Sequence, residues 1–127
     1  MSDDRKKVLV IEDEEGVREM VGRMLTKSNF EVEEAVDGLD GLRKIDSALP
    51  DLIIADVMMP NLDGLTLVKA LKKFKETKSV PVIFLTAKGD ARSMIEGINV
   101  GAKYYVTKPF QMDDLMSKVG KVFGGRY

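Results

Sequence analysis

The sequence of 127 residues contains no cysteine, no histidine and no tryptophan. Without thiols or imidazoles, the chain can form no disulfide, no zinc or haem site of the usual kind, and no catalytic centre based on a thiol or an imidazole. Any chemistry must therefore use carboxylates, hydroxyls and lysines, together with a hard metal ion where a metal takes part.

An excess of charge of one sign is also lacking. The 20 basic and 21 acidic residues leave a net charge of -1, so nothing favours direct nucleic-acid binding. With 44% hydrophobic and 32% charged residues, the chain should fold as one globular domain over residues 1–127. Its charged start has no secretory apolar segment, and no run approaches about 18 apolar residues, so we expect a cytoplasmic protein that enters no membrane.

Segments with strand and helix patterns alternate five times along the chain. The strand expected around 52–55 is apolar throughout, as in a strand buried on both faces, whereas Phe30–Val36 alternates in part and predicts an exposed edge strand. This alternation predicts an α/β fold, in which one sheet of five parallel strands is covered on both faces by five helices through right-handed crossovers.

Apolar residues at helical spacing predict which side chains face the core. Leu49 at the end of the second helix and Phe74 in the third, expected over 63–77, should face inward. The lysine-rich surface of the third helix is predicted to be a solvated face. The fourth helix, with Asp90 as its N-cap and Gly97 inside it, should be the easiest to shift, because an interior glycine costs on the order of 1 kcal/mol relative to alanine.

Polar side chains stand where four of the apolar strands end. They are Glu12 and Asp13 after the first strand, Asp56 after the third, Thr86 after the fourth and Lys108 after the fifth. Because the carboxyl ends of parallel strands meet at one edge of a sheet, three acids, a hydroxyl and an ammonium should converge there. An ionised carboxylate at the end of a buried strand is costly without nearby cations or donors, so the cluster predicts a functional site.

Three other kinds of site are disfavoured. No Gly-x-Gly-x-x-Gly motif opens a helix and no glycine-rich loop ends in Gly-Lys-Ser or Gly-Lys-Thr, which argues against nucleotide binding. Residues 12–16 are acidic but lack the alternating ligands of a calcium-binding helix-loop-helix loop. A phosphatase of the haloacid dehalogenase class needs a second acid two residues after its nucleophilic aspartate, and Met58 occupies that position after Asp56.

Several motifs of this sequence occur together in one known family. They are Val-Leu-Val-Ile-Glu12-Asp13, Asp56-Val-Met-Met-Pro60 followed by Asp63-Gly64, Leu85-Thr86-Ala87, Gly101-Ala102 and Tyr105-Val-Thr-Lys108-Pro109-Phe110. With this set, the whole chain resembles a response-regulator receiver domain of two-component signal transduction, the family that includes the chemotaxis response regulator. The resemblance implies the flavodoxin-like, doubly wound sheet with the strand order of this family, 2-1-3-4-5.

The resemblance also assigns roles to the acids. It implies that Asp56 is the phosphoacceptor, forming an aspartyl phosphate in a reaction that depends on Mg²⁺ or Mn²⁺. Asp13, Asp56 and the backbone carbonyl of Met58 would bind the metal, and Glu12 would bind it directly or through water. Glutamate stands at position 12 where the family more commonly has aspartate, so the two modes stay open.

The remaining site residues take their roles from the same resemblance. Lys108 and the Thr86 hydroxyl would each contact a phosphoryl oxygen, and the Lys108–Pro109 peptide bond would be cis. Thr86 and Tyr105 would act as a switch, Tyr105 rotating into space that Thr86 leaves, so that the face of the fourth helix, fifth strand and fifth helix changes. Met58 and Lys88 would tune the access of hydrolytic water. The domain would not be an enzyme that acts on other molecules, and would catalyse only its own phosphorylation and dephosphorylation.

The phosphoryl donor must be another molecule, because the chain has no histidine. The resemblance implies a sensor histidine kinase or a histidine phosphotransfer protein as the partner, while the output protein or output domain is unknown. Two alternatives stay open. The chain could be the N-terminal receiver of a longer regulator, for example one that binds DNA, or a pseudo-receiver that signals by binding without phosphorylation.

Overall fold

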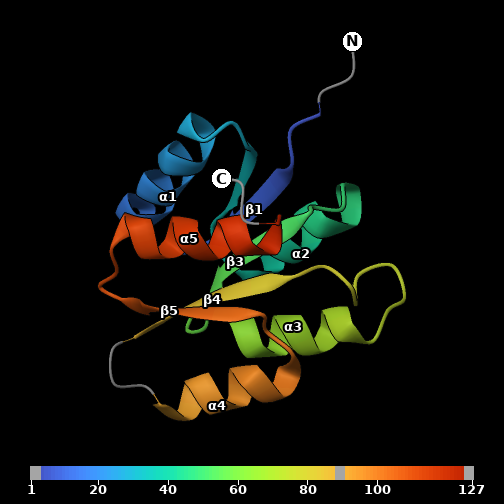
Figure 1. The fold of residues 1–127 in the computed structure, drawn as a ribbon. Helices are drawn as coiled ribbons and strands as arrows, with labels where there is room; N and C mark the ends of the chain where they lie inside the picture. The colour runs from blue at the N-terminus through green and yellow to red at the C-terminus, as the bar shows by residue number, and fades with distance from the viewer. Residues whose placement is uncertain (1–3, 88–90, 125–127) are drawn as a thin grey trace.

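One sheet of five parallel strands, in the order β2-β1-β3-β4-β5, forms the centre of the molecule (Figure 1). The structure, a computed structural model, describes residues 4–87 and 91–124, so the predicted roles of Lys88 and Asp90 fall outside the described residues. The strands are β1 (Lys7–Ile11), β2 (Glu31–Ala35), β3 (Leu52–Asp56), β4 (Val82–Ala87) and β5 (Tyr104–Lys108), and the helices are α1 (Glu15–Lys27), α2 (Gly38–Ser47), α3 (Gly64–Lys72), α4 (Ala91–Val100) and α5 (Met112–Val122). The predicted fold class and strand order are confirmed.

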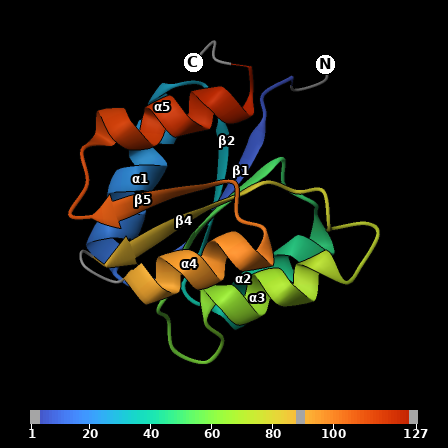
Figure 2. The ribbon, with the colours of Figure 1, turned by 60° about the horizontal axis from the view of Figure 1, so that its bottom comes forward.

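The helices form two layers, one on each face of the sheet (Figures 1 and 2). Along β1, Val8 and Val10 face the layer of α1 and α5, whereas Leu9 and Ile11 face the layer of α2, α3 and α4. Strands buried on both faces need apolar residues at every position, and β3 meets this requirement with each of its residues buried. The domain therefore has two apolar cores that are separated by the sheet.

Strand β2 lies at the edge of the sheet, as the sequence predicted. It pairs only with β1 among the described strands, from Lys7 opposite Glu31 to Ile11 opposite Ala35. Its burial increases from the exposed Glu31 to the buried Ala35. Charged residues on an edge strand discourage pairing with other chains, and three of the five residues of β2 are glutamates.

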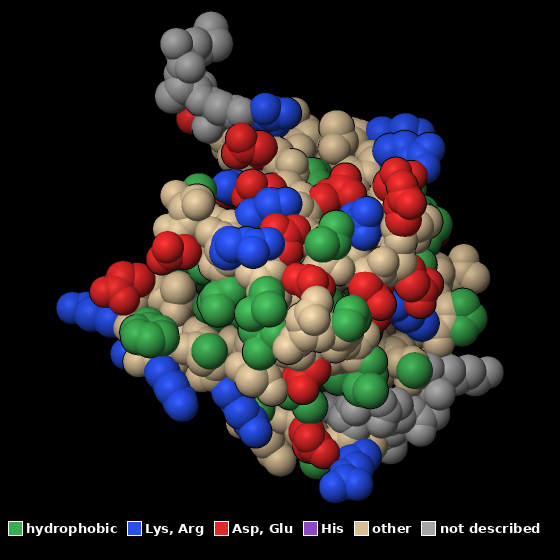
Figure 3. All heavy atoms as spheres, turned by 180° about the vertical axis from the view of Figure 1, so that it is seen from behind, with side chains coloured by type: hydrophobic (Ala, Val, Ile, Leu, Met, Phe, Trp, Pro, Cys, Tyr) green, Lys and Arg blue, Asp and Glu red, His purple; other side chains and the backbone are tan. Residues whose placement is uncertain are grey.

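Two expected core positions are wrong. Leu49 is 51% exposed and Phe74 is 59% exposed, and hydrophobic side chains gather on the side of α2 and α3 when the molecule is seen from behind (Figure 3). Helix α3 ends at Lys72 instead of continuing to Thr77. The Thr77 hydroxyl donates a hydrogen bond to the carbonyl oxygen of Leu71 at 2.5 Å. In a longer helix, this carbonyl would instead accept a hydrogen bond from a backbone amide.

None of the helices in the described part of the chain combines the length and apolar character that a membrane crossing requires.

Candidate functional site

Three carboxylates meet at the edge where the strands end. Asp56 is the last residue of β3, and Glu12 and Asp13 directly follow β1, the neighbour of β3 in the sheet. One oxygen atom from each of the three lies within 4.8 Å of the others. Glu12 is fully buried and Asp56 is 7% exposed, whereas Asp13 is exposed to solvent. The structure thus brings together the acids that the strand-end pattern singled out.

Lys108 contributes the positive charge of this cluster. Its Nζ lies 2.9 Å from Asp56 Oδ2, 2.6 Å from Glu12 Oε1 and 3.9 Å from Glu14 Oε1. Lys108 is the last residue of β5, and its side chain must pass the end of β4 to reach β3. Its register partner on β4 is Ala87, whose small side chain leaves room for this path. The Lys108–Pro109 peptide bond is cis, as expected.

Burial and ion pairing have opposite effects on the pKa values of Glu12 and Lys108. Burial raises the pKa of Glu12 from 4.5 to about 7, although the hydrogen bonds from Lys108 and from the Glu14 backbone act in the opposite direction. Burial alone would lower the pKa of Lys108, but its hydrogen bonds to Glu12 and Asp56 outweigh this effect, and the pKa of the ammonium is raised. Lys108 therefore remains charged at neutral pH.

Backbone groups and one arginine hold the acids in place. The Glu14 amide donates to Glu12 Oε2 and the Met58 amide to Asp56 Oδ1, each at 3.1 Å. Arg18, from the second turn of α1, donates from Nη1 to the Glu12 carbonyl oxygen at 2.9 Å and from Nε to Glu34 Oε1 at 3.2 Å. Sequence reasoning missed Arg18, because attention to strand ends gives no signal for a residue within the helix that follows.

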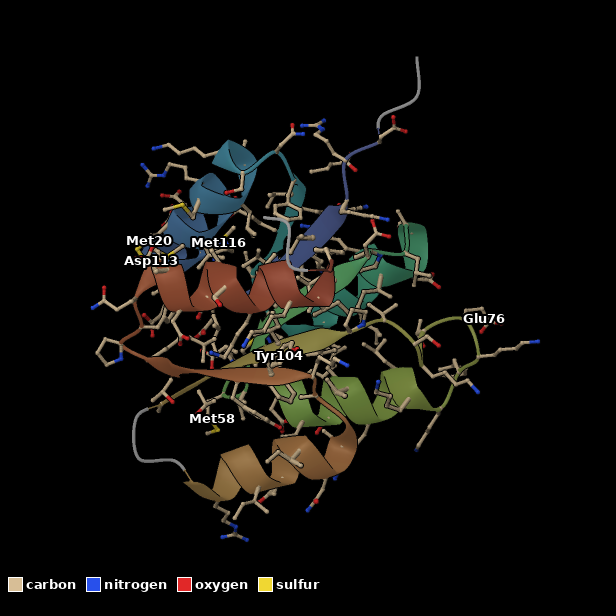
Figure 4. All side chains as sticks on the ribbon, viewed as in Figure 1. Met20, Met58, Glu76, Tyr104, Asp113 and Met116 are labelled. Carbon is tan, nitrogen blue, oxygen red and sulfur yellow. The ribbon has the colours of Figure 1, made fainter. Side chains whose placement is uncertain are left out.

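The donor set fits a hard divalent cation. All three side chains offer carboxylate oxygens, which are the ligands that Mg²⁺ prefers. With one ammonium against three carboxylates, the cluster carries a formal charge of -2, which a divalent cation would balance. Met58 lies at the edge toward which β4 and β5 run, with its side chain 65% exposed (Figure 4). Its carbonyl oxygen stays a predicted ligand.

The two residues expected to act as a switch lie on β4 and β5. Thr86 is buried, and its hydroxyl donates a hydrogen bond to the carbonyl oxygen of Ala87 at 3.2 Å. The Tyr105 ring packs against Phe84, with ring centroids 6.0 Å apart, and its hydroxyl lies under α4 against Gly97, where a methyl group would collide with it.

The Tyr105 hydroxyl is buried and finds no hydrogen-bond partner among the described residues. Burial raises its pKa to about 12. The ring is therefore turned into the protein, in a site that Gly97 leaves open, while the Thr86 hydroxyl is engaged with the backbone of its own strand.

With this fold and this acidic edge, the chain belongs to the response-regulator family. The family "Response regulator receiver domain" matches residues 8–120, so this protein contains the receiver domain of a two-component response regulator.

Its relatives include longer regulators. The chain is 37% identical to the phosphate regulon transcriptional regulatory protein PhoB of Klebsiella pneumoniae over 92% of this chain and 51% of that protein. It is 34% identical to the DNA-binding dual master transcriptional regulator RpaA of Synechocystis over 89% of this chain and 47% of that protein. The chain thus spans about half the length of these relatives.

Solved receiver structures match over nearly their whole length. The chemotaxis response regulator CheY4 of Vibrio cholerae superposes with a TM-score of 0.87 at 36% identity, covering 93% of this chain and 98% of that one. The receiver domain of the Francisella response regulator 1452 gives a TM-score of 0.85 at 34% identity, covering 94% and 97%.

Proposed function

We propose that the domain accepts a phosphoryl group on Asp56 from a phosphohistidine of a sensor histidine kinase or histidine phosphotransfer protein. One observation carries the proposal: the Asp56 carboxylate is buried between two further acids and in contact with a lysine ammonium. A carboxylate oxygen attacks the phosphorus atom in line, and the bond between phosphorus and the donor's imidazole nitrogen breaks. Its electron pair stays on the imidazole, which then takes a proton from solvent.

The surrounding charges serve this reaction by neutralisation. Phosphoryl transfer spreads negative charge over the phosphoryl oxygens, and fixed positive groups lower its barrier. Lys108, already 2.9 Å from Asp56, would contact one of these oxygens. A bound Mg²⁺ or Mn²⁺, held by Asp13, Asp56 and the Met58 carbonyl with Glu12 as a direct or water-mediated ligand, would supply further positive charge.

Phosphorylation would then change the surface formed by α4, β5 and α5. Thr86 would give up its bond to the Ala87 carbonyl and donate its hydroxyl to a phosphoryl oxygen. Tyr105, which packs under α4 against Gly97, would transmit this movement to the helix. A coupling of roughly 1–3 kcal/mol between the phosphorylation site and this face is expected for such a switch.

The domain acts as a signalling switch and catalyses only its own phosphorylation and dephosphorylation. A pseudo-receiver would not require the ion pairs of Lys108 with Asp56 and Glu12, so these contacts favour phosphoacceptance. The transcriptional regulators among the relatives indicate a DNA-binding output domain as one reader of the switch, and the near-complete match to CheY4 indicates a separate output protein as the other.

Phosphorylation with acetyl phosphate in the presence of Mg²⁺ tests the nucleophile. Intact mass spectrometry should find one added phosphoryl group that is lost in acid or hydroxylamine, and none on Asp56→Asn. Asp46→Asn, which changes an exposed acid on α2, is the matched control and should react like the wild type. Acid-labile phosphate on Asp56→Asn would refute the assignment, and an unchanged rate after Mg²⁺ is chelated would refute the metal.

A further inference from the structure

A groove runs between α2 and α3, on the face away from α1 and α5. Its cavity measures about 840 Å³. Apolar side chains dominate its walls, among them Leu39, Leu42 and Leu49 on the α2 side and Ala70 and Phe74 on the α3 side. Leu39 is 48% exposed, Leu49 51% and Phe74 59%, whereas the core residues of the same domain are at most 7% exposed. Contiguous exposed apolar surface of this kind marks interaction sites in soluble proteins.

Hydrogen bonds hold the segments that form the two walls of the groove. Asp37 caps α2 by accepting from the Asp40 amide at 2.8 Å, and Asp63 caps α3 by accepting from the Thr66 amide at 2.7 Å. At the far end, the Thr77 hydroxyl holds the turn that carries Phe74 by its bond to the Leu71 carbonyl. The groove is therefore preformed, so that a ligand need not order it on binding.

The outer face of α3 beside the groove is basic. Lys69 on α3 and Lys73 directly after it each precede a groove residue by one position in the sequence, and both are exposed. Neither forms an ion pair with any residue in 4–87 or 91–124. The α2 side is balanced, because Arg43 and Asp46 both line it. The acid that lines the α3 side, Glu76, lies beyond Phe74 in the segment after the helix, so Lys69 and Lys73 still leave this side with an excess of positive charge. Lysine and arginine side chains accordingly lie beside the hydrophobic area in Figure 3.

We propose that this groove binds an amphipathic helix of a partner protein, with leucine-type residues in the groove and acidic residues along the α3 side. A cleft between two helices accepts a third helix that anchors side chains at positions i, i+3, i+4 and i+7. Lys69 and Lys73, which form no ion pair within the described residues, favour acidic residues on the flank that faces α3. The two charges of α2 impose no sign on the other flank.

The groove lies away from the acidic edge, so this binding goes beyond phosphoacceptance. Leu49 follows α2 and precedes β3, and Phe74 follows α3 and precedes β4, which places both toward the edge where the strands begin. Figure 4 shows Glu76, another groove residue, on the side of the molecule opposite to Met58. A partner helix can therefore occupy the groove while a phosphodonor approaches Asp56.

The test uses two synthetic peptides of roughly 15 residues, about the length at which an isolated helix begins to be stable. Both carry leucines at the four anchor positions, and they differ only in one flank, which is glutamate in the first and lysine in the second. In NMR titrations of the full chain, the glutamate peptide should shift the amides of Ala48, Ala70 and Thr77, and should bind at least about tenfold more tightly than the lysine peptide.

Variants separate the apolar and the charged contributions. Phe74→Ser should weaken the glutamate peptide about tenfold or more, whereas Met20→Ser, at an apolar position on α1 that is 42% exposed, should leave binding unchanged. Lys73→Glu should weaken the glutamate peptide and strengthen the lysine peptide. Phosphorylation of Asp56 by acetyl phosphate should be the same in all three variants, which keeps this test independent of the proposed function.

Three results would overturn the proposal. One is that neither peptide shifts the groove amides of the wild type. A second is that both peptides bind with equal affinity, which would remove the acidic partner. The third is a dimer in sedimentation equilibrium that Phe74→Ser abolishes, because a second copy of this chain would then be the occupant.

Discussion

The ionisation of Glu12 should make the metal-free protein lose stability as the pH rises. Burial raises the pKa of this carboxyl from 4.5 to about 7 in the folded state, so the folded protein holds a proton that the unfolded chain has already released. The resulting stabilisation is complete below pH 4.5 and is lost as the pH rises through about 7. Since a tenfold change in proton affinity is about 1.4 kcal/mol, the change from 4.5 to about 7 corresponds to a loss of at most about 3.5 kcal/mol.

Urea unfolding in the presence of a chelator measures this effect. Circular dichroism is the suitable signal, because the chain contains no tryptophan. From pH 4.5 to above pH 7, the free energy of unfolding should fall more steeply for the wild type than for Glu12→Gln, which keeps a side-chain oxygen for the Glu14 amide but cannot ionise. Asp46→Asn removes an exposed acid and should follow the wild type.

Addition of Mg²⁺ should reverse the dependence. A cation that binds ionised carboxylates stabilises the folded state by about 2.7 kcal/mol at a concentration one hundred times its dissociation constant. The gain for the wild type should be larger above pH 7 than at pH 5, because binding at low pH must first displace the proton of Glu12. The reasoning is refuted if the wild type and Glu12→Gln have the same slope in chelator.

Three further changes test other parts of the structure. Gly97→Ala should push the Tyr105 ring out of its site, because the added methyl group meets the Tyr105 hydroxyl; the ring's NMR signals should shift, and those of Phe30 in the other core should not. Arg18→Met removes the bonds to the Glu12 carbonyl and to Glu34, and should lower both the free energy of unfolding by about 1 kcal/mol and the Mg²⁺ affinity severalfold. Burial raises the pKa of Tyr105 from 10.0 to about 12, so the stability that its neutral hydroxyl contributes should be complete below pH 10 and lost as the pH rises through about 12. Over that range, the free energy of unfolding should fall more for the wild type than for Tyr105→Phe.

The alternation of strands and helices predicted the fold class because the sequence pattern of each strand and each helix is local. The apolar run between Pro50 and Pro60 indicates a buried strand from its own residues, and right-handed crossovers then leave few topologies. The convergence of Glu12, Asp56 and Lys108 follows from the same logic, since parallel strands place their carboxyl ends at one edge. The sequence could not predict which carboxylate oxygens the Lys108 ammonium contacts, because its side chain reaches past β4 to two acids on different segments.

Leu49 and Phe74 show where local pattern fails. Both fit the apolar spacing of the helix before them, but each helix ends earlier than the spacing does, at Ser47 and at Lys72. Beyond the last helical residue the chain turns and the side chain no longer follows the core-facing stripe, so it lies at the surface. Periodicity identifies a face only as far as the helix continues, and tertiary hydrogen bonds such as that of Thr77 decide where it stops.

Glu12 and Asp56 share the ammonium of Lys108, and this connects the proposed phosphorylation of Asp56 with the proposed binding of a metal ion. Lys108 is within 2.9 Å of both Glu12 and Asp56, and Glu12 is fully buried, so this contact offsets part of the cost of its charge. A phosphoryl group on Asp56 would add negative charge and draw the ammonium toward its oxygens. Glu12 would then lose its partner and must either take up a proton, which its raised pKa allows, or face another cation. When Mg²⁺ is chelated after Asp56 has been phosphorylated, Glu12 should therefore take up a proton, and the proton uptake measured in weak buffer should be larger for the wild type than for Glu12→Gln. Equal uptake by both proteins in chelator would show that Lys108 does not link the two acids.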